Sequence, residues 1–234
     1  MKPMWPFYTA YYTFYDYLCS VYQPGTMIEV IEKYFPDMSP EQRQQFEQLG
    51  VLYPEWNAKI NVISRKDIDN LMTNHVLHSL SVGKFLSPVD GTTFIDIGTG
   101  GGFPGIPMAV MYPKCRFHLI DRIGKKINVA SSIAKEIGLT NVTFQHGDLS
   151  ECHEKYDFAI SRAVMKLPDL LKIARANIAR RAPRNAYPNG LIVLKGGDLR
   201  PELDGLRTDY LEEDLSMWFH EPYFETKKLI YVPF

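Results

Sequence analysis

The stretch "FIDIGTGGGFPG", residues 94–105, places five glycines and one proline directly after a short apolar run. The apolar run is typical of a buried β-strand, and glycine permits backbone conformations that residues with a Cβ atom avoid. The stretch therefore predicts a strand followed by a tight loop whose backbone closely approaches a ligand or a neighbouring strand. A plain tight turn is the alternative that the glycines alone leave open.

Short strand-like segments follow this loop and alternate with helical ones towards the C-terminus. The strand candidates are residues 92–98, 115–121, 141–148, 156–163, 189–197 and 227–234, and the helix candidates are residues 124–137 and 167–181. The strand candidates are apolar without strict alternation, which is typical of parallel strands that are covered on both faces. We therefore predict an α/β fold with a doubly wound, Rossmann-like and mostly parallel sheet.

The chain on the N-terminal side of the loop has a helical pattern. Residues 39–42, Ser-Pro-Glu-Gln, form a capping box with proline at the first helical position. One buried helical face follows, because apolar residues recur at spacings of three and four. These residues are Phe46, Leu49, Tyr53, Trp56 and Ile60. With a second helix predicted after Asp67, we expect a helical cap over residues 27–87 and a sheet-containing domain over residues 88–234.

The first 26 residues differ in composition from the rest of the chain. They are crowded with tyrosine, carry Asp16 within an apolar part and show no small-residue cleavage site, which is atypical of a signal peptide. We interpret residues 1–26 as an N-terminal appendage outside the fold, ahead of Met27, where an ordinary start would stand. An aromatic helix that packs on the domain is the alternative interpretation.

Bulk composition excludes several classes of protein. The formal net charge of −1 provides no global basic field for a polyanionic partner, although it leaves room for a local basic patch. The three cysteines stand far apart without a CxxC pair, so we expect a reducing cytoplasmic location and neither a disulfide framework nor a metal site. No apolar run reaches the roughly 18 residues that a membrane span needs.

The spacing of the glycines distinguishes between two kinds of adenosine-containing cofactor. A dinucleotide loop ends its G-x-G-x-x-G pattern in glycine or alanine, and Phe103 stands here at that position. The stretch instead fits an acidic-x-G-x-G-x-G pattern, which resembles the first motif of S-adenosylmethionine (SAM)-dependent methyltransferases. The residues of this pattern are Asp96, Gly98, Gly100 and Gly102. In that motif the acidic group faces the ammonium end of the cofactor, and the bare backbone lets the sulfonium-bearing chain pass closely.

Two further acidic residues follow predicted strands at the same edge of the sheet. Asp121 ends the second strand, where a carboxylate can accept hydrogen bonds from both hydroxyls of a ribose. Asp148 follows His146 and Gly147 after the third strand, where an acidic side chain can accept from the adenine amino group. Dinucleotide enzymes use the same device as Asp121, so these residues indicate an adenosine ligand without identifying it.

The next two strands end in basic side chains. Arg162 and Lys195 are expected at the carboxyl edge of the sheet, without a Pro-Cys nucleophile or a D/N/S-P-P-F/Y/W tetrad in the sequence. Two cations without a base suit an acceptor that carries a lone pair and has no proton to lose, such as N7 of guanine. The alternatives are that Arg162 pairs with the cofactor carboxylate and that Lys195 is a solvated surface lysine.

Other basic residues have structural as well as functional interpretations. His75 and His78, on the second cap helix, are interpreted as core or surface residues rather than catalytic ones. A basic cluster that contains no acidic residue either follows RNA phosphates or reflects the preference for cations at a helix C-terminus. Its members are Lys172, Arg175, Arg180, Arg181 and Arg184.

Taken together, these motifs resemble the RsmG (GidB) family, the guanine-N7 methyltransferases of bacterial 16S ribosomal RNA. The matching stretches run in family order from about residue 28 to the C-terminus and leave out the first 26 residues. They are "WNAKINVISRKD", "HVLHSL", "FIDIGTGGGFPGIP", "HLIDRIGKK", "ISRAV" and "LKGG". One departure is His146, because many relatives carry an arginine at that position.

The motifs and the resemblance together imply a set of functional residues in a SAM-dependent methyltransferase domain with a helical N-terminal cap. The residues expected to bind SAM are Asp96, Gly98, Gly100, Gly102, Phe103, Asp121, Gly147, Asp148 and Arg162. The residues expected to face the RNA are Lys125, Lys126, Arg162 and Lys195. Of these, Arg162 and Lys195 are expected to be catalytic.

The resulting hypothesis is a cytoplasmic enzyme that transfers a methyl group from SAM to N7 of a guanine in 16S rRNA. We expect a monomer that acts on the RNA, the small subunit or an assembly intermediate, without a metal or a membrane. The alternatives are a SAM-dependent methyltransferase for another RNA or a small molecule, an NAD(P)-dependent oxidoreductase, and a non-catalytic RNA-binding module that kept only the fold.

Overall fold

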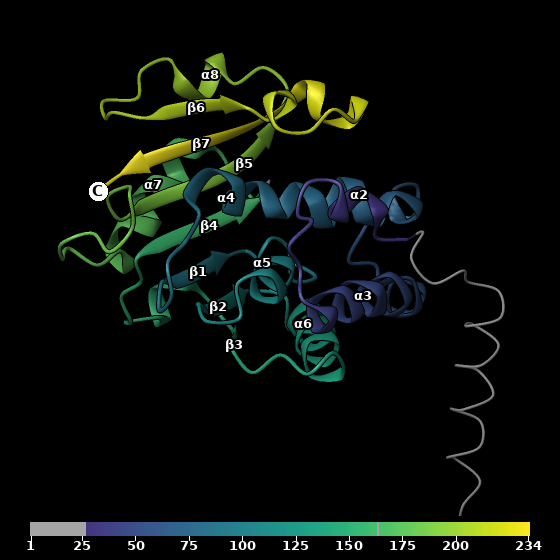
Figure 1. The fold of residues 1–234 in the computed structure, drawn as a ribbon. Coiled ribbons are helices and arrows are strands. Elements are labelled where there is room, and N and C mark those ends of the chain that lie inside the picture. The colour runs from purple at the N-terminus through teal and green to yellow at the C-terminus, as the bar shows by residue number, and fades with distance from the viewer. Residues whose placement is uncertain (1–26, 163) are drawn as a thin grey trace, which may run out of the picture.

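A seven-stranded sheet forms the centre of the protein. The computed structural model describes residues 27–162 and 164–234, so the appendage predicted for residues 1–26 lies outside the described residues. The strands are β1 (Thr93–Ile97), β2 (Arg116–Asp121), β3 (Val142–His146), β4 (Phe158–Arg162), β5 (Gly190–Gly196), β6 (Leu211–Asp214) and β7 (Lys227–Pro233). Their order across the sheet is β3-β2-β1-β4-β5-β7-β6, as Figure 1 shows.

The directions of the strands confirm the predicted doubly wound, mostly parallel sheet. β1 pairs in parallel with β2 and β4, and the parallel pairing continues to β3 on one side and to β5 on the other. β7 lies antiparallel between β5 and β6. The chain order reverses between β1 and β4, and in such sheets ligands bind beyond the carboxyl ends of the strands at this switch point.

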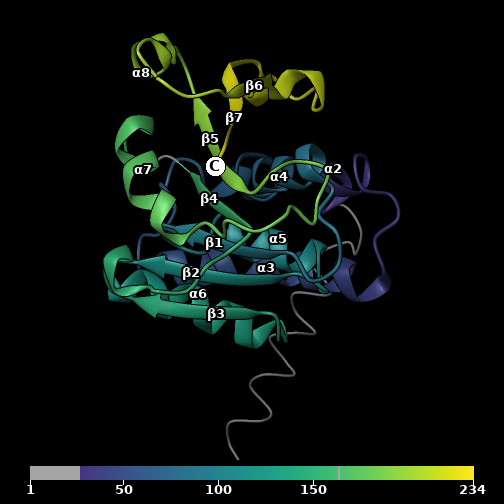
Figure 2. The same ribbon diagram turned by 90° about the vertical axis from the view of Figure 1, so that its left-hand side faces the viewer.

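Helices cover both faces of the sheet, as parallel strands require. They are α2 (Glu29–Glu32), α3 (Pro40–Lys59), α4 (His78–Leu86), α5 (Gly105–Met111), α6 (Gly124–Glu136), α7 (Leu167–Ala174) and α8 (Arg200–Leu203). Figure 2 shows α4 and α5 on one face and α7 on the other. Phe94 and Phe117 belong to the hydrophobic cluster of the first face, and Leu170 and Leu191 to that of the second. Within the described residues, no helix combines the length and the apolar character of a membrane span.

The predicted capping box closes the start of α3. Ser39 Oγ accepts a hydrogen bond from Gln42 N at 3.2 Å, and Gln42 Oε1 accepts one from Ser39 N at 2.8 Å. The Gln42 side-chain amide also donates to the carbonyls of Val110 and Met111, so the cap is tied to α5. Apolar residues of the cap and of the sheet share one cluster, and the boundary proposed at residue 87 stays a prediction.

The second cap helix is less regular than the sequence pattern predicts. It begins with a 3-10 turn, η1 (Ile68–Asn70), and continues as a π-helical segment, η2 (Leu71–Leu77), before α4 starts at His78. Apolar spacing over one or two turns does not distinguish an α-helical from a π-helical turn, because both place residues four positions apart near the same face. His75 lies within this π-helical segment.

Two C-terminal segments also differ from the prediction. The helix expected over residues 167–181 ends at Ala174, followed by a 3-10 turn, η4 (Arg175–Asn177). Beyond this turn the backbone pairs with Tyr156 instead: the Asn177 carbonyl accepts from Tyr156 N and Ala179 N donates to the Tyr156 carbonyl, both at 2.8 Å. The buried Asn177 side chain fixes the turn by donating to the carbonyls of Cys152 and Glu154. β6 was not predicted, because its four residues, Leu-Glu-Glu-Asp, form a mostly exposed edge strand without an apolar pattern.

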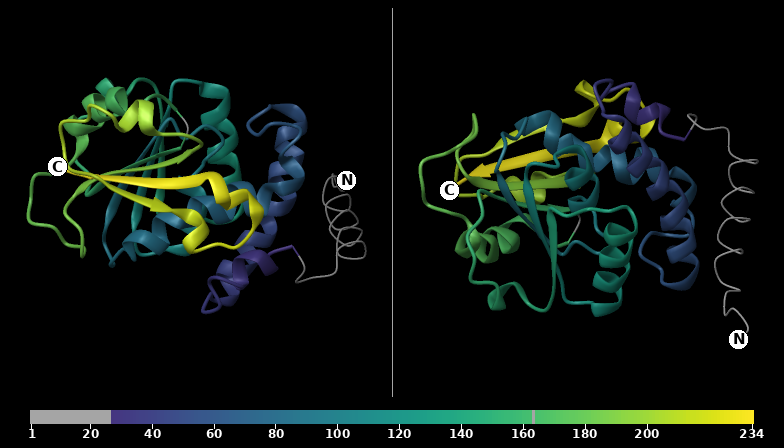
Figure 3. Two further views of the ribbon diagram at one scale, coloured as in Figure 1. Left: turned by 90° about the horizontal axis from the view of Figure 1, so that it is seen from above. Right: turned by 60° about the horizontal axis from the view of Figure 1, so that its bottom comes forward.

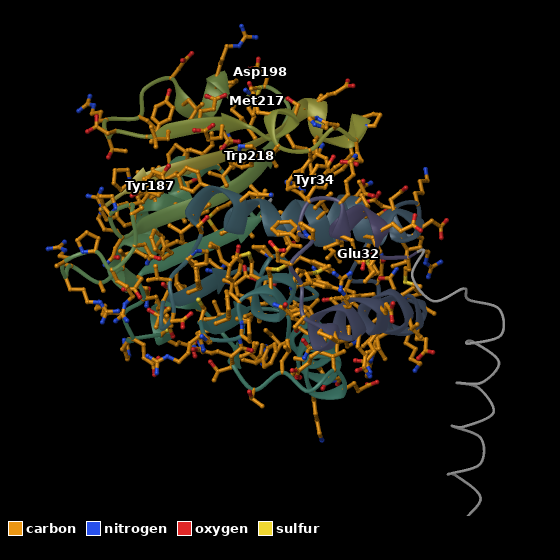
Figure 4. All side chains as sticks on the ribbon, viewed as in Figure 1. Glu32, Tyr34, Tyr187, Asp198, Met217 and Trp218 are labelled. Carbon is orange, nitrogen blue, oxygen red and sulfur yellow. The ribbon has the colours of Figure 1, made fainter. Side chains whose placement is uncertain are left out.

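The segment between β6 and β7 contacts the N-terminal cap. It contains the 3-10 turns η5 (Leu215–Met217) and η6 (Pro222–Thr226). The hydroxyl of Tyr34, just after α2, donates to Glu221 at 2.9 Å and accepts from His220 N at 2.8 Å. Figure 3 shows α2 beside this yellow segment, and Figure 4 labels Tyr34 next to it. Segments almost 190 positions apart in the sequence are therefore held together.

Candidate functional site

A cavity opens at the carboxyl ends of β1, β2 and β4, at the switch point of the sheet. Its volume is about 630 Å³, which suits a small-molecule ligand. The walls come from the glycine loop, the start of α6, the turn after β3 and the segment after β4. Residues in these walls include Val62, Gly98, Gly100, Phe103, Asp121, Lys126, Gly147, Arg162, Val164 and Ile173.

The glycine loop connects β1 to α5 along one wall of the cavity. Gly100 has a φ of +57°, a left-handed conformation that glycine adopts without strain. A Cβ atom at Gly100 would meet nothing within 4 Å, so this part of the loop presents bare backbone to open space. The N–H of Gly100 donates to Asp121 Oδ2 at 2.8 Å, which ties the loop to the end of β2.

The helical cap holds the outer side of the glycine loop. The Tyr53 hydroxyl donates to the carbonyl of Gly101 at 2.8 Å, and the Tyr53 ring packs on Phe103 with the ring centroids 4.6 Å apart. Val62 lies against Gly101, where a Cβ atom would come within 2.8 Å of the valine side chain. The buried Asn57 side chain accepts from Val62 N at 2.8 Å and fixes this turn. The cap is therefore part of the cavity wall.

Asp96 lies inside the protein, behind the glycine loop. It is 1% exposed, and its Oδ2 accepts from Thr99 Oγ1 at 2.6 Å and from Gly105 N at 2.8 Å. Burial raises the pKa of Asp96 to about 7. Its Oδ1 has no hydrogen-bond partner among the described residues. The carboxylate is thus held in place through one oxygen only, although the charge of nearby Arg162 favours its ionised form.

The carboxylate of Asp121 forms part of the wall at the end of β2. Its Oδ1 accepts from Ile123 N at 2.8 Å, and its Oδ2 accepts from Gly100 N. Each oxygen therefore accepts one backbone hydrogen bond and keeps a further lone pair. This arrangement holds the carboxylate rigidly while it can still accept bonds from a ligand in the cavity.

The turn after β3 brings Gly147 to the cavity but turns Asp148 aside. Asp148 Oδ1 accepts from Ser150 N at 2.9 Å, and the carboxylate forms an ion pair with Arg122, which is a wall residue. The bond from Ser150 and the charge of Arg122 lower the pKa of Asp148. Nε2 of the exposed His146 ring lies 3.2 Å from the carbonyl oxygen of Arg122. The position of the usual family arginine is thus beside the cavity rather than in it.

Arg162 ends β4 and extends into the cavity wall between the glycine loop and the cap. Its guanidinium lies over the Phe103 ring, 5.0 Å from the ring centroid. Its Nη1 donates to the Asn74 carbonyl at 3.3 Å, and its Nη2 lies 2.9 Å from His75 Nδ1. The sequence interpretation of His75 as a plain core or surface residue therefore missed its contact with Arg162.

Lys195 ends β5 as predicted, but its side chain is engaged in an ion pair. The Nζ atom donates to Glu202 Oε2 in α8 at 2.6 Å and to the Met165 carbonyl at 2.8 Å, and the side chain is 9% exposed. Glu202 also accepts from Leu167 N at the start of α7. Lys195 therefore holds Met165, which is a wall residue, without lining the cavity itself.

The remaining basic residues differ in what they contact. Lys126, in the first turn of α6, lines the cavity, and the neighbouring Lys125 is exposed. In the basic cluster, Arg181 donates to the buried carboxylate of Asp157 at 2.6 Å, and Arg184 lies 3.9 Å from the same carboxylate. Part of the cluster thus compensates a buried charge, which is a structural role.

The structure brings many of the expected cofactor residues to one cavity and leaves others behind it. Those in the walls are Gly98, Gly100, Phe103, Asp121, Gly147 and Arg162, whereas Asp96, Gly102 and Asp148 are outside them. Sequence reasoning missed the apolar wall residues Val62, Val164, Met165 and Ile173. Two of them carried a signal, because Val62 belongs to the stretch "WNAKINVISRKD" and Val164 to "ISRAV". The role of each residue towards a ligand stays a prediction.

The cavity wall contains cations but little that could act as a base. Within the described residues, Asp121 is the only carboxylate of the wall, and no histidine, cysteine or tyrosine joins it. The described part of the chain also contains no group of three or more His, Cys, Asp or Glu residues suited to a metal ion. The arrangement can orient a ligand and stabilise negative charge, and it offers no obvious group for removing a proton.

Comparison with known proteins identifies one family. Residues 42–214 match the GidB family, described as rRNA small subunit methyltransferase G. A relative from Porphyromonas gingivalis, named ribosomal RNA small subunit methyltransferase G, is 55% identical over 205 residues, which cover 88% of this chain and 93% of the relative. A relative of the same name from Bacteroides thetaiotaomicron is 53% identical over 204 residues, which cover 87% of this chain and 98% of the relative.

A solved structure with a similar fold is the ribosomal protein L11 methylase from Lactobacillus delbrueckii subsp. bulgaricus. The TM-score is 0.50 at 14% identity, over 67% of this chain and 75% of that one, and a likeness of this kind concerns the fold alone. The family match covers more than half of the chain, and the relatives cover most of it at high identity. The chain therefore belongs to the rRNA small subunit methyltransferase G family and is an enzyme of the methyltransferase class.

Proposed function

We propose that this protein transfers the methyl group of SAM to N7 of a guanine in 16S rRNA. The observation that carries the proposal is the composition of the cavity wall. Asp121 is the only carboxylate among its described residues, and backbone N–H groups already bind both of its oxygens. N7 of guanine has a lone pair and no proton, so its methylation needs alignment of that lone pair and electrostatic fixing of the base rather than a proton acceptor.

Two features of the cavity and one residue behind it fit SAM. The open space beside Gly100 admits a chain close to the backbone, and the remaining lone pairs of Asp121 suit the ribose hydroxyls. The unpartnered Oδ1 of Asp96, behind the loop, suits the positive charge of the ammonium end. When bound, SAM supplies an electrophilic methyl group on its sulfonium. We place the adenine near Gly147, and the role of Asp148 would then include holding Arg122 at that end.

The protein's own contribution to the reaction is orientation. Arg162 stands at the junction of the glycine loop and the cap, with its guanidinium over Phe103. A guanidinium there can donate to O6 of a guanine or to an adjacent phosphate, and this fixes the base with N7 towards the methyl group. In-line alignment of the lone pair with the methyl–sulfur bond then accounts for the acceleration.

The basic residues near the opening would contact the RNA backbone. Lys126 and the exposed Lys125 lie together at the start of α6, next to the cavity. Lys195 contributes through its ion pair with Glu202, because a direct contact with RNA would require that pair to break. We retain the predictions of a cytoplasmic monomer whose substrate is 16S rRNA, in the free form or within a small subunit or assembly intermediate.

Methyl transfer to small ribosomal subunits tests the proposal. The full chain is incubated with methyl-labelled SAM and subunits from cells that lack its gene, and labelled N7-methylguanine is mapped in the RNA. We expect Arg162→Ala to lower kcat/KM by about 100-fold or more, because the acceptor loses its orientation. The matched control is Arg116→Ala, an exposed arginine at the opposite, amino end of β2. No transfer by the unmodified protein, or full activity of Arg162→Ala, would overturn the proposal.

Three further measurements separate the alternative functions. Calorimetry with SAM and with NAD(P) distinguishes a methyltransferase from an oxidoreductase, and Phe103 in the loop already disfavours a dinucleotide. Transfer to a small molecule without any RNA would indicate a different methyltransferase. A non-catalytic RNA-binding module would bind subunits, and Arg162→Ala in cells would then leave rRNA methylation unchanged.

A further inference from the structure

A chain of three side chains connects the helical cap to Arg162. Arg162 Nη2 lies 2.9 Å from His75 Nδ1, and His75 Nε2 lies 2.6 Å from Asp67 Oδ2. Asp67 precedes η1, His75 lies in η2, and Arg162 ends β4, so the chain joins two separate parts of the fold. We propose that Asp67 and His75 are positioning residues that orient Arg162 towards the methyl acceptor, an inference that rests on the function proposed above.

The chemistry of the three groups allows one arrangement of protons. A guanidinium only donates hydrogen bonds, so His75 Nδ1 must accept from Arg162. The hydrogen of the neutral imidazole is then on Nε2, where it donates to the Asp67 carboxylate. Asp67 Oδ1 accepts from Asn74 Nδ2 at 2.6 Å, which fixes the carboxylate in turn. Both nitrogens of His75 are occupied, and it has no free position for a substrate proton.

The surroundings of His75 favour this neutral form. Burial and the charge of Arg162 lower the pKa of His75 to about 4, whereas Asp67 acts in the opposite direction. The other titratable group facing it is His78, one turn further along the cap, whose own pKa burial lowers as well. His75 therefore stays an acceptor for Arg162 throughout the neutral pH range.

The π-helical segment supplies a second acceptor for the same guanidinium. The Asn74 carbonyl accepts from Arg162 Nη1 at 3.3 Å, and the adjacent His75 accepts from Nη2. Two consecutive residues thus hold both terminal nitrogens, and the Phe103 ring lies against the guanidinium at 5.0 Å. π-Helical turns are rare and frequently mark functional sites. The plane of the guanidinium is therefore set before any RNA binds.

The position of the acceptor atom provides a sharp test. In His75→Asn the side-chain oxygen can replace Nδ1, whereas in His75→Gln the amide lies nearer the place of Nε2. We expect His75→Leu to lower kcat on small subunits by about 100-fold and His75→Asn to recover at least about tenfold of that loss. His75→Gln should recover less than His75→Asn, and the KM for SAM should change less than kcat in all three variants.

A second set of variants shows whether His75 acts through Arg162. In an Arg162→Ala background, His75→Leu should cause no further loss beyond about twofold, because the group that it positions is gone. The matched control is His118→Leu, since both ring nitrogens of His118 also have partners, Thr143 and Gln145, but on the sheet. Its activity should equal that of the unmodified protein, and thermal unfolding of every variant checks that it is folded.

Nitrogen-15 NMR of the histidine rings provides a readout that is independent of activity. The unmodified full chain at pH 7 should show His75 as the neutral Nε2–H tautomer, and Asp67→Ala should shift it away from that tautomer. An Nδ1–H or charged His75, recovery by Gln equal to that by Asn, or a full additional loss in the Arg162→Ala background would overturn the inference. Absence of methyl transfer by the unmodified protein would overturn the proposed function instead and leave the tautomer to be judged by NMR.

Discussion

Burial shifts the pKa values of two titratable residues near Arg162 in opposite directions. It raises the pKa of Asp96 to about 7 and lowers that of His75 to about 4. In both cases the low-dielectric interior disfavours the charged form, which is protonated for histidine and ionised for aspartate. Both shifts therefore reduce the charge that these two side chains carry near Arg162.

Asp96 should make stability depend on pH. Its pKa in the folded protein is about 7 and lies above the ordinary value of 3.8, so its contribution is favourable at low pH and is lost as the pH rises through 7. We expect Asp96→Asn to gain about 2 to 3 kcal/mol of stability relative to the unmodified protein between pH 5 and pH 8. Urea unfolding without ligand at the two pH values measures the free energy of unfolding of both proteins. The contribution of His75 cancels in the difference because both proteins carry this residue.

A stability difference between Asp96→Asn and the unmodified protein that does not change from pH 5 to pH 8 would contradict the pKa of Asp96 that burial raises. The same experiment with SAM present adds a comparison. If the ammonium end of SAM approaches Asp96, the ligand should stabilise the unmodified protein more than Asp96→Asn, because only the carboxylate gains a charge partner.

At the scale of elements, ion pairs and turns hold pieces of the cavity wall. The pair between Lys195 and Glu202 joins β5 to α8 and, through Met165, to the wall. The buried amide of Asn57 shapes the turn that brings Val62 against the glycine loop. Lys195, Glu202 and Asn57 are not wall residues. Their effects on a ligand must therefore pass through the backbone that they fix.

The ion pair predicts similar effects on methyl transfer, but different effects on stability, from substitutions of its two members. Glu202→Gln leaves the 9% exposed Lys195 without a counter-charge and should lower the free energy of unfolding by about 2 kcal/mol. Lys195→Met should lower it less, because the partly exposed Glu202 reaches water, and both variants should reduce methyl transfer by similar factors. A far greater loss of activity in Lys195→Met than in Glu202→Gln would contradict this and indicate direct contact between Lys195 and RNA.

The turn after α3 predicts a coupling between the cap and the cofactor. Asn57→Ala leaves the N–H groups of Val62 and Ile63 and the Ile63 carbonyl without their buried partner, at a cost of about 2 to 4 kcal/mol. We also expect weaker binding of SAM in calorimetry, because Val62 lines the cavity. Asn128→Ala, at an exposed position in α6, is the control and should change neither quantity.

At the scale of the whole molecule, the helical cap packs against the C-terminal segment between β6 and β7. The cap contributes to the same hydrophobic cluster as the sheet, and α2 is tied to the segment before β7 by Tyr34 and by the pair of Lys33 with Glu221. The hydroxyl oxygen of Tyr223, in that segment, lies 3.0 Å from His78 Nδ1. The C-terminal segment thus supports the cap helix that carries the positioning residue His75.

Loss of the Tyr34 hydroxyl should loosen both segments together. Tyr34→Phe removes the bonds to Glu221 and His220 and is expected to lower the free energy of unfolding by about 1 kcal/mol. Hydrogen exchange should become faster in residues 29–35 and in residues 215–226, because these segments open as a unit. Tyr187→Phe is the control, since Tyr187 contacts Phe85 through its ring. Faster exchange in only one segment would contradict the coupling.

Local patterns accounted for much of the fold and for part of the site. The predicted segments contain β1 to β5, β7 and α6, and the capping box at Ser39 forms as predicted, because each depends on neighbouring residues. β6 escaped prediction because its pairing with β7, and not its own acidic sequence, makes it a strand. The pairing of Lys195 with Glu202 could not be derived either, since no spacing in the sequence indicates which charge it meets.

The sequence by itself determined the glycine loop, the acidic residues at the strand ends and the family. These features follow from backbone conformation and from the identity of single residues, both of which are written locally in the chain. Only the tertiary structure decided that Asp96 lies behind the loop, that Lys195 is paired, and that His75 receives the N–H of Arg162 from 87 positions away. The reason is physical: burial and long-range hydrogen bonds arise only when separate segments pack together.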